Sequence, residues 1–439
     1  MSRHLTSAEL AGLLEGVASR DLIAEFFEHH LEVCETCRKE CDRLQSGDFG
    51  ETSWREVVEV ATALSAERTE HLARLEQIAR REFRELMRLP VSARRHKINR
   101  AINRFRNPIL VDLLLAESER QAIRDPWAAL ALAECAFDAV FRVSHRQFGE
   151  AWAMTCLARA HAHRGNALRA TGDFKQADEG LLLALRIFDE GGNGDPLVEA
   201  EILSLLASLR MDQRSFVEAD AYIDMARGIY EKIDETRFVG LLLVQKSMLF
   251  FNSGDFDQAI VVGLKALAAI DPTADAKLYL AAEHNYTFFL TEAGRYREAW
   301  ARLEAHASLY DAFPDSWTQL RRQKLQSEIL RGLGRREEAE AALISVRVGF
   351  MHEGLGFHAA MAGLALAYLY VEECRTQEVK RLAEEMVPIF MAQDIHREAA
   401  AALLLFQEAA RQEAVTISML KELIAYMGRV KTAPARKPS

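Results

Sequence analysis

Three residues that can bind a metal ion lie within eight positions near the start of this 439-residue chain. His30, Cys34 and Cys37 follow the spacing His-x3-Cys-x2-Cys, which on a helix brings one imidazole and two thiols together. Thiolate sulfur and imidazole nitrogen are the ligands that tetrahedral Zn²⁺ takes in proteins. A closed structural zinc site needs a fourth protein ligand, and the candidates are His4 and Cys41.

The sequence around these residues is similar to that of a known zinc module. The spacing His4-x25-His30-x3-Cys34-x2-Cys37, with the flanking phrases His4–Leu10 and Cys37–Glu40, resembles the zinc-binding anti-sigma domain of bacteria. The resemblance covers residues 1–45 and implies a small helical domain with His4, His30, Cys34 and Cys37 as the zinc ligands. It also implies a sigma factor as partner, and in some members of that family thiol oxidation releases both zinc and partner.

The composition of the whole chain favours helices and excludes several classes of protein. Only 9 prolines and 23 glycines interrupt a sequence that is 49% hydrophobic and 27% charged, so we expect an all-α protein. A net charge of −10 argues against a general nucleic-acid binder, because such proteins are more often basic. No run of 18 apolar residues and no apolar leader occur, which predicts a cytoplasmic protein without a membrane anchor.

A short phrase recurs from the middle of the chain onward: glycine, an aromatic residue two positions later, and alanine three positions after that. Clear copies are Gly172–Ala177, Gly254–Ala259 and Gly294–Ala299, with weaker copies at Arg214–Ala219 and Gly334–Ala339. The final residues of successive copies are Ala177, Ala219, Ala259, Ala299, Ala339 and Val379. The first two are 42 residues apart, and the others follow at intervals of 40 residues. Twelve residues before each stands a small side chain: Gly165, Ala207, Ser247, Thr287, Ser327 and Ala367. This pattern predicts antiparallel helix pairs that approach closely at the small residues, with glycine ending each first helix.

These features resemble the tetratricopeptide repeat family over residues 155–390, although the period is near 40 residues instead of about 34. The resemblance implies an α-α superhelical solenoid whose concave face, lined by the first helices, binds a peptide or protein. Projecting the repeat register places these residues on that face: Asn166, Arg169, Met248, Phe251, His284, Phe288, Arg321, Lys324 and Tyr368. These residues either contact a partner, such as an acidic peptide, or only face the solvent or the protein's own N-terminal helices.

A basic segment precedes the array. Residues 94–106 contain six arginines and lysines and no acidic residue, and Ile98, Ile102 and Phe105 follow helical spacing among them. The pattern predicts a basic amphipathic helix. The helix either contacts nucleic acid or an acidic partner surface, or packs on the start of the solenoid with its arginines paired to acidic neighbours.

We therefore predict four regions: a zinc module (1–45), a charged helical connector (52–106), a tetratricopeptide-like solenoid (107–430) and a disordered tail (431–439). The predicted function is a cytoplasmic regulatory adaptor that binds a protein or peptide. The alternatives are a transcription regulator that uses residues 94–106 on nucleic acid and a scaffold that zinc only stabilises. The sequence contains no phosphate-binding loop, nucleophile elbow or His-Glu-x-x-His motif, so no enzyme activity is expected.

The ligand spacing makes a test possible. Purified, reduced protein supplied with zinc should hold one Zn²⁺ per chain, and Cys34→Ser should abolish it because a thiolate ligand is lost. Cys41→Ser should leave the metal in place. Elemental analysis of the two variants and of His4→Ala decides the fourth ligand: loss of zinc in Cys41→Ser but not in His4→Ala would contradict the assignment.

Overall fold

A computed structural model describes residues 4–5, 9–10, 34, 36–37, 39, 70–122, 125–143, 149–392 and 397–430. These ranges are helical and contain no strand, as predicted from the composition. The chain divides into two compact units, Met1–Arg88 and Leu89–Ser439. The predicted tail (431–439), His30 and Cys41 lie outside the described residues.

The first unit includes a charged helix over residues 70–87. Ion pairs between residues four apart stabilise its exposed side: Arg74 to Glu70 at 2.5 Å and Arg80 to Glu76 at 2.6 Å. Ala79 and Leu86 are fully buried. The helix ends beside Leu89 and Pro90, where the sequence predicted a break.

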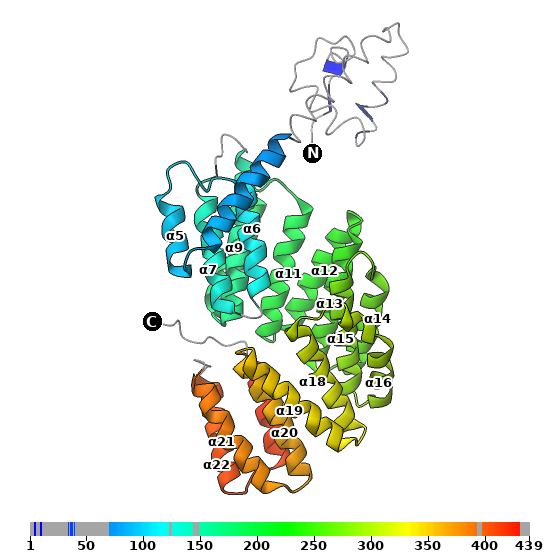
Figure 1. Cartoon of the computed structure of the whole chain (residues 1–439). Helices are drawn as coiled ribbons and strands as arrows, with labels where there is room; N and C mark the ends of the chain where they lie inside the picture. The colour runs from blue at the N-terminus through cyan, green and yellow to red at the C-terminus, as the bar shows by residue number, and fades with distance from the viewer. Residues whose placement is uncertain are drawn as a thin grey trace. The chain divides into compact units, whose positions relative to one another are not determined.

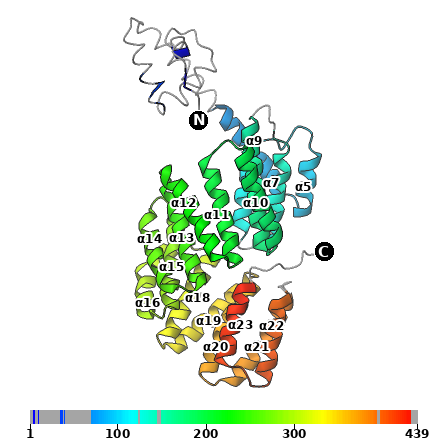
Figure 2. The ribbon, with the colours of Figure 1, turned by 180° about the vertical axis from the view of Figure 1, so that it is seen from behind.

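The second unit is an array of helix pairs in which each helix packs mainly on its neighbours in sequence, as Figures 1 and 2 show from opposite sides. It begins with α5 (Val91–Arg100), α6 (Pro108–Gln121) and α7 (Pro126–Val140). The first helices of the pairs are α9 (Glu150–Thr171), α11 (Pro196–Asp212), α13 (Thr236–Ser253), α15 (Ala276–Glu292), α18 (Ser316–Gly332) and α20 (Gly356–Glu372). Their second helices are α10 (Phe174–Gly191), α12 (Phe216–Lys232), α14 (Phe256–Ala269), α16 (Tyr296–Ala305) with α17 (Ala307–Asp311), α19 (Arg336–His352) and α21 (Thr376–Ala392). Two more, α22 (Arg397–Arg411) and α23 (Ile417–Val430), follow. None of the described helices is long and apolar enough to cross a membrane.

The repeat register derived from the sequence is confirmed by burial. All six residues at the end of the recurring phrase are buried, from fully buried Ala177 to Val379 at 3% exposure. The small residues twelve positions earlier are buried as well, including Gly165, Ser247 and Ser327. Each pair of positions lies on the two helices of one repeat, so small side chains meet where the backbones come closest.

Aspartates and glycines fix the helix ends. Asp195, Asp275 and Asp315 cap the starts of α11, α15 and α18 by accepting a backbone N–H. Gly172 and Gly254 end α9 and α13 with φ of 83° and 91°, which a glycine adopts without steric strain. In two copies of the recurring phrase, arginine or cysteine replaces the first glycine. The backbone keeps the same left-handed conformation there, with φ of 62° at Arg214 and 58° at Cys374.

The basic segment differs from the predicted helix. Helix α5 ends at Arg100. Of the three apolar residues predicted to share one helical face, Ile98 within α5 and Phe105 beyond it are buried, whereas Ile102 is 80% exposed. Helix α5 packs on α7, where Arg95 pairs with Glu134 at 2.6 Å and with Asp138 at 2.8 Å. These contacts match the packing interpretation of residues 94–106 and leave Arg95 engaged with carboxylates.

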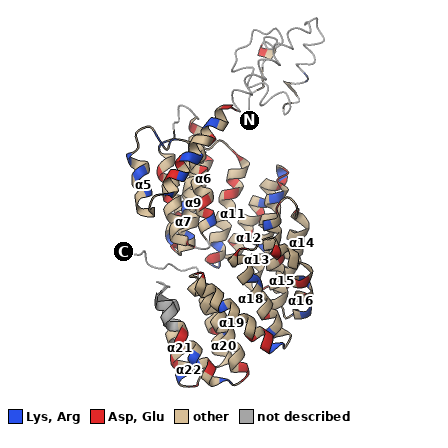
Figure 3. Cartoon of the chain, in the orientation of Figure 1, with Lys and Arg blue, Asp and Glu red and all other residues tan. Residues whose placement is uncertain are grey.

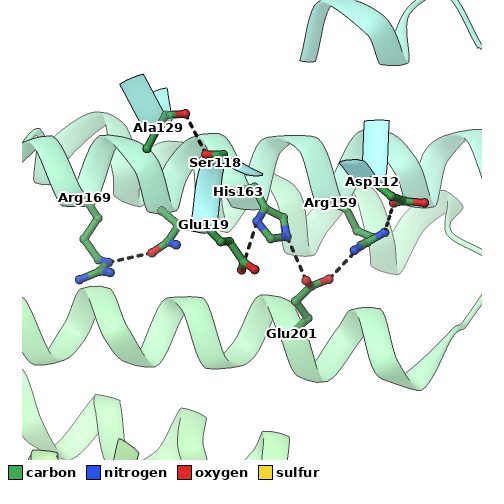
Figure 4. Close-up of polar contacts among 9 residues, drawn as sticks. Asp112, Ser118, Glu119, Ala129, Arg159, His163, Arg169 and Glu201 are labelled. Atoms are coloured by element: carbon green, nitrogen blue, oxygen red, sulfur yellow. Dashed lines mark hydrogen bonds and ion pairs between the residues drawn. The ribbon is translucent and has the colours of Figure 1, made fainter. Parts of the chain in front are cut away.

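Helices α6, α9 and α11 are joined by an ionic network centred on the buried His163 (Figure 4). The His163 side chain is 3% exposed, and its Nε2 lies 2.9 Å from Glu201 while its Nδ1 lies 3.5 Å from Glu119. Arg159 pairs with Glu201 at 2.9 Å and with Asp112 at 2.5 Å. The two ring nitrogens face different carboxylates and Arg159 adds a positive charge, so the cluster fits an imidazolium held between carboxylates better than a metal ion.

The network shifts both of its central groups. Burial opposes protonation of His163, but the hydrogen bond and charge of Glu201, with Glu119, outweigh it and raise the pKa of His163. Burial opposes ionisation of Glu201, yet His163 and Arg159 together lower the pKa of Glu201 to about 2. Two residues earlier on α9, burial and the charge of Arg164 lower the pKa of His161.

The register predicts which substitutions the array tolerates. Ala259→Leu forces a larger side chain into a fully buried contact and should lower the free energy of unfolding by about 1–3 kcal/mol. Ala268→Leu, at an exposed position of the same helix, should change it by less than about 0.5 kcal/mol. Urea unfolding followed by circular dichroism measures both, and equal effects would contradict the register.

The His163 network predicts a pH dependence with a definite sign. A raised folded-state pKa stabilises most below the unfolded value of about 6.5, and the gain is lost as pH rises through the folded pKa. The stability advantage of the wild type over His163→Gln should therefore be larger at pH 5.5 than at pH 9. His161→Gln is the matched control, and its advantage should change in the opposite direction because the pKa of His161 is lowered. Urea unfolding across this range tests both, and a flat difference for His163→Gln would refute the assigned charge.

Candidate functional site

The predicted metal ligands that the structure describes lie together. His4 Nδ1 is 3.3 Å from Cys34 Sγ and 3.7 Å from Cys37 Sγ. All three ligand atoms lie within 4.8 Å of one another, with Cys37 buried, Cys34 half-buried and His4 exposed. Residues 30 positions apart in sequence thus meet at one point, whereas the contribution of His30 lies outside the described residues.

These distances suit a metal ion. A sulfur at about 2.3 Å and a nitrogen at about 2.0–2.1 Å from a tetrahedral Zn²⁺ lie about 3.5 Å apart, close to both observed separations. Burial, opposed by a backbone hydrogen bond from Leu5, raises the pKa of the Cys37 thiol. A thiolate at this position would therefore need a nearby positive charge, which Zn²⁺ supplies.

We call the first helices of the pairs the inner helices and the second helices the outer ones. A cavity of about 420 Å³ opens between the inner helices α15 and α18, the short helix α17 and the end of α6. Its cationic residues are Arg120, Lys277 and Arg321, and its aromatic residues are His284, Tyr310 and Trp317. Leu280, Ala281, Asp315 and Thr318 complete the lining. Figure 3 shows that basic and acidic residues are interspersed along the array, so local pairing decides where charge remains unbalanced.

Arg321 is the half-buried cation without an ion-pair partner in the described lining: Arg120 pairs with Glu117 at 2.5 Å, and Lys277, which has no partner there either, is exposed. Among the described residues no carboxylate forms an ion pair with Arg321; its guanidinium lies instead 5.9 Å from the centre of the Trp317 ring. Burial lowers the pKa of Arg321, and the charge of Tyr310 only partly opposes this. The guanidinium nevertheless remains protonated in water-filled sites, so the cavity presents a half-buried positive charge.

The neighbouring imidazole adds no charge. His284 Nδ1 lies 3.0 Å from the hydroxyl of Tyr310, which is 2% exposed. Burial, with the charges of Arg321 and Lys324, holds the pKa of His284 well below its usual value. His284 is therefore neutral near pH 7, and with Tyr310 it forms a polar but uncharged wall.

The structure brings together only part of the predicted concave face. His284 and Arg321 line the cavity. The rings of Phe251 and Phe288 lie 4.9 Å apart and tilted by 53°, and both residues, with Met248, are partly buried against the core to which α13 and α15 contribute. The remaining residues make contacts within the array: Asn166 and Arg169 to each other and Arg169 to Asp212, Lys324 to Glu328 at 2.5 Å, and Tyr368 beneath the guanidinium of Arg331.

Of the ten described lining residues, sequence reasoning identified only His284 and Arg321, and four of the eight that it missed show why. Tyr310 and Trp317 flank the break between α17 and α18, where the chain leaves the repeat and where an Asp-Ser-Trp start of a helix was the available signal. Arg120 reaches the cavity from α6, far from α18 in sequence, and no periodicity of a single repeat predicts that approach. Lys277 lies two turns before His284, the first predicted position on α15.

A second, smaller cavity of about 280 Å³ adjoins the first. The two share Lys277 and Ala281 in their linings. Phe238, Leu241 and Leu278 give the second cavity an apolar surface. Two of its three charged residues neutralise each other, since Arg237 pairs with Asp275 at 2.7 Å, and the third is Lys277.

No protein-family model matches the chain, and no curated protein matches it in sequence. Solved structures do match its fold. A Rap protein complexed with Competence and Sporulation Factor is 13% identical, with a TM-score of 0.53 over 74% of this chain and 88% of that one. A signal transduction ATPase of the STAND class with a tetratricopeptide repeat sensor, from Pyrococcus horikoshii, is 15% identical, with a TM-score of 0.51 over 96% of this chain and 62% of that one. Such identities concern the fold alone, and on that ground this chain carries an all-α, tetratricopeptide-like helical-repeat fold.

Proposed function

We propose that this protein is a regulatory adaptor that binds a peptide or protein segment on the inner helices of its array. The observation that carries the proposal is the cavity between α15 and α18, which combines aromatic walls with an arginine that has no carboxylate partner in the described chain. Concave sites with a few placed polar groups are where proteins bind ligands. The Rap structure, named as a complex with Competence and Sporulation Factor, supports the idea that such an array can hold a partner.

The proposed role is binding without catalysis, in the cytoplasm. The cavity combines a neutral imidazole, a buried phenol and a guanidinium, which suit recognition by charge, stacking and hydrogen bonding. The pKa of Tyr310 is raised by burial, so its hydroxyl stays protonated and can donate a hydrogen bond. None of these groups is an activated nucleophile paired with a base.

For the N-terminal unit we propose a structural Zn²⁺ held by His4, Cys34 and Cys37, with His30 as the fourth ligand. The support is the sulfur–nitrogen separations of 3.3 and 3.7 Å. The metal would hold together segments that are 30 residues apart, which is how small zinc domains acquire stability. The resemblance to anti-sigma domains makes a sigma factor the first partner class to test with this unit.

Selection from a phage-displayed random heptapeptide library tests the binding role. The full-length protein should enrich peptides with a shared motif. Ala281→Trp, which places a large ring in both cavities, should abolish that enrichment, whereas Ala268→Trp, at an exposed position of the outer helix α14, should not. Thermal melts establish that both variants fold. Enrichment that survives Ala281→Trp would show that these cavities are not the binding site.

A further inference from the structure

The two adjoining cavities differ in chemistry but share a wall. We propose that they form one groove that reads an extended peptide by a carboxylate in the first cavity and an apolar side chain in the second. This inference rests on the proposed peptide-binding function and names what the site recognises. Lys277 and Ala281 line both cavities, so neighbouring groups of one ligand can occupy them together.

The pairing of other inner-face cations shows why Arg321 matters. On the first helices, Arg159 pairs with Asp112 and Glu201, Lys246 with Asp220 and Asp224, and Lys324 with Glu328, all at 2.9 Å or less. The structure gives Arg321 a tryptophan ring but, in the part of the chain that it describes, no ion-pair partner. An unpaired half-buried charge is unfavourable, and an anion from outside would remove that penalty.

The position of Arg321 is fixed well enough for recognition. Trp317, against which it lies, contacts the rings of Phe350 at 6.2 Å and His358 at 4.8 Å, and Phe350 is 1% exposed. The same wall is continued by Tyr310, held to His284. A planar guanidinium on a rigid aromatic support presents its N–H groups in the geometry that a carboxylate accepts.

The balance of charge favours a carboxylate over a phosphate. Arg120 is already paired with Glu117 at 2.5 Å. Asp315 adds a negative charge to the lining, where its oxygens accept hydrogen bonds from the backbone and hydroxyl of Thr318. Arg321 and Lys277 remain as two positive charges against the one negative charge of Asp315. A singly charged carboxylate balances this lining better than a phosphate carrying about −1.5 to −2.

The second cavity is suited to an apolar side chain. Leu241 is 42% exposed although it lies on the inner helix α13, and it stands beside Phe238 and Leu278. Because Arg237 and Asp275 neutralise each other, the charge left in the described lining is that of the exposed Lys277, which this cavity shares with the first. Covering this surface with an apolar group removes it from water, which is the main source of affinity for such contacts.

The test uses two synthetic random heptapeptide libraries, one with free carboxyl ends and one with amidated ends, applied to immobilised full-length protein. Retained peptides, identified by mass spectrometry, should carry an apolar residue next to a carboxylate. Retention from the free-acid library alone would identify the chain end as the carboxylate, and enrichment of aspartate or glutamate from both would identify a side chain.

Variants separate the two halves of the groove. Arg321→Gln should weaken binding of the selected peptides by about 10- to 100-fold and erase the acidic preference. Leu241→Ser should weaken it by about 5- to 10-fold and erase the apolar preference, leaving the acidic one. Arg297→Gln and Leu264→Ser change exposed residues of α16 and α14 by the same chemistry and should alter neither. Thermal melts confirm that each variant folds.

The outcomes distinguish this inference from the function on which it rests. Peptides retained equally by the wild type and Arg321→Gln, without acidic enrichment, would overturn the carboxylate assignment and leave the peptide-binding role standing. Displacement of the peptides by inorganic phosphate at concentrations where acetate has no effect would also overturn it, in favour of a phosphate. Retention of no peptide from either library would contradict the binding role itself.

Discussion

The close approach of two helices at small residues is the constraint on which this array depends. At Gly165 an added methyl group would lie 2.9 Å from the side chain of Leu181 and 3.1 Å from the carbonyl oxygen of Ala177. The partner position, Ala177, is fully buried. Because the same pair of small residues recurs from repeat to repeat, one local contact sets the geometry of every helix pair.

Within this helical packing, charged side chains are mostly neutralised by oppositely charged residues close to them. The network of His163, Glu201 and Arg159 shows the general arrangement, in which cations and carboxylates from successive first helices neutralise one another. Such pairing offsets the desolvation of each charge but adds specificity more than stability. Arg321 departs from the arrangement and is tolerated because its guanidinium faces a cavity. The residue thus contributes little to folding, and its chemistry remains available to a ligand.

The sequence specified the helix pairs well because periodic burial and turn chemistry are local properties. The positions from Ala177 to Val379 and the glycines at 172 and 254 were all identified from spacing. The basic segment was predicted too long, since helical spacing of Ile98 and Ile102 does not reveal that only Ile98 is covered by α7. The approach of Arg120 to Arg321 depends on how many small rotations between repeats add up, which no single repeat encodes.

The candidate groove lies where the repetition is broken. Other second helices run without interruption for 14 to 18 residues, as α14 and α10 do, whereas α16 ends after 10 residues and the chain turns at His306. This turn brings Tyr310, on the short helix α17, to the inner side, where its hydroxyl meets His284. The next helix then begins with Trp317 beside the cavity. A regular repeat buries equivalent residues everywhere and therefore distinguishes no place along the array. An irregular repeat exposes residues that its neighbours lack, so a binding site with its own specificity can form there without disturbing the packing that holds the rest together.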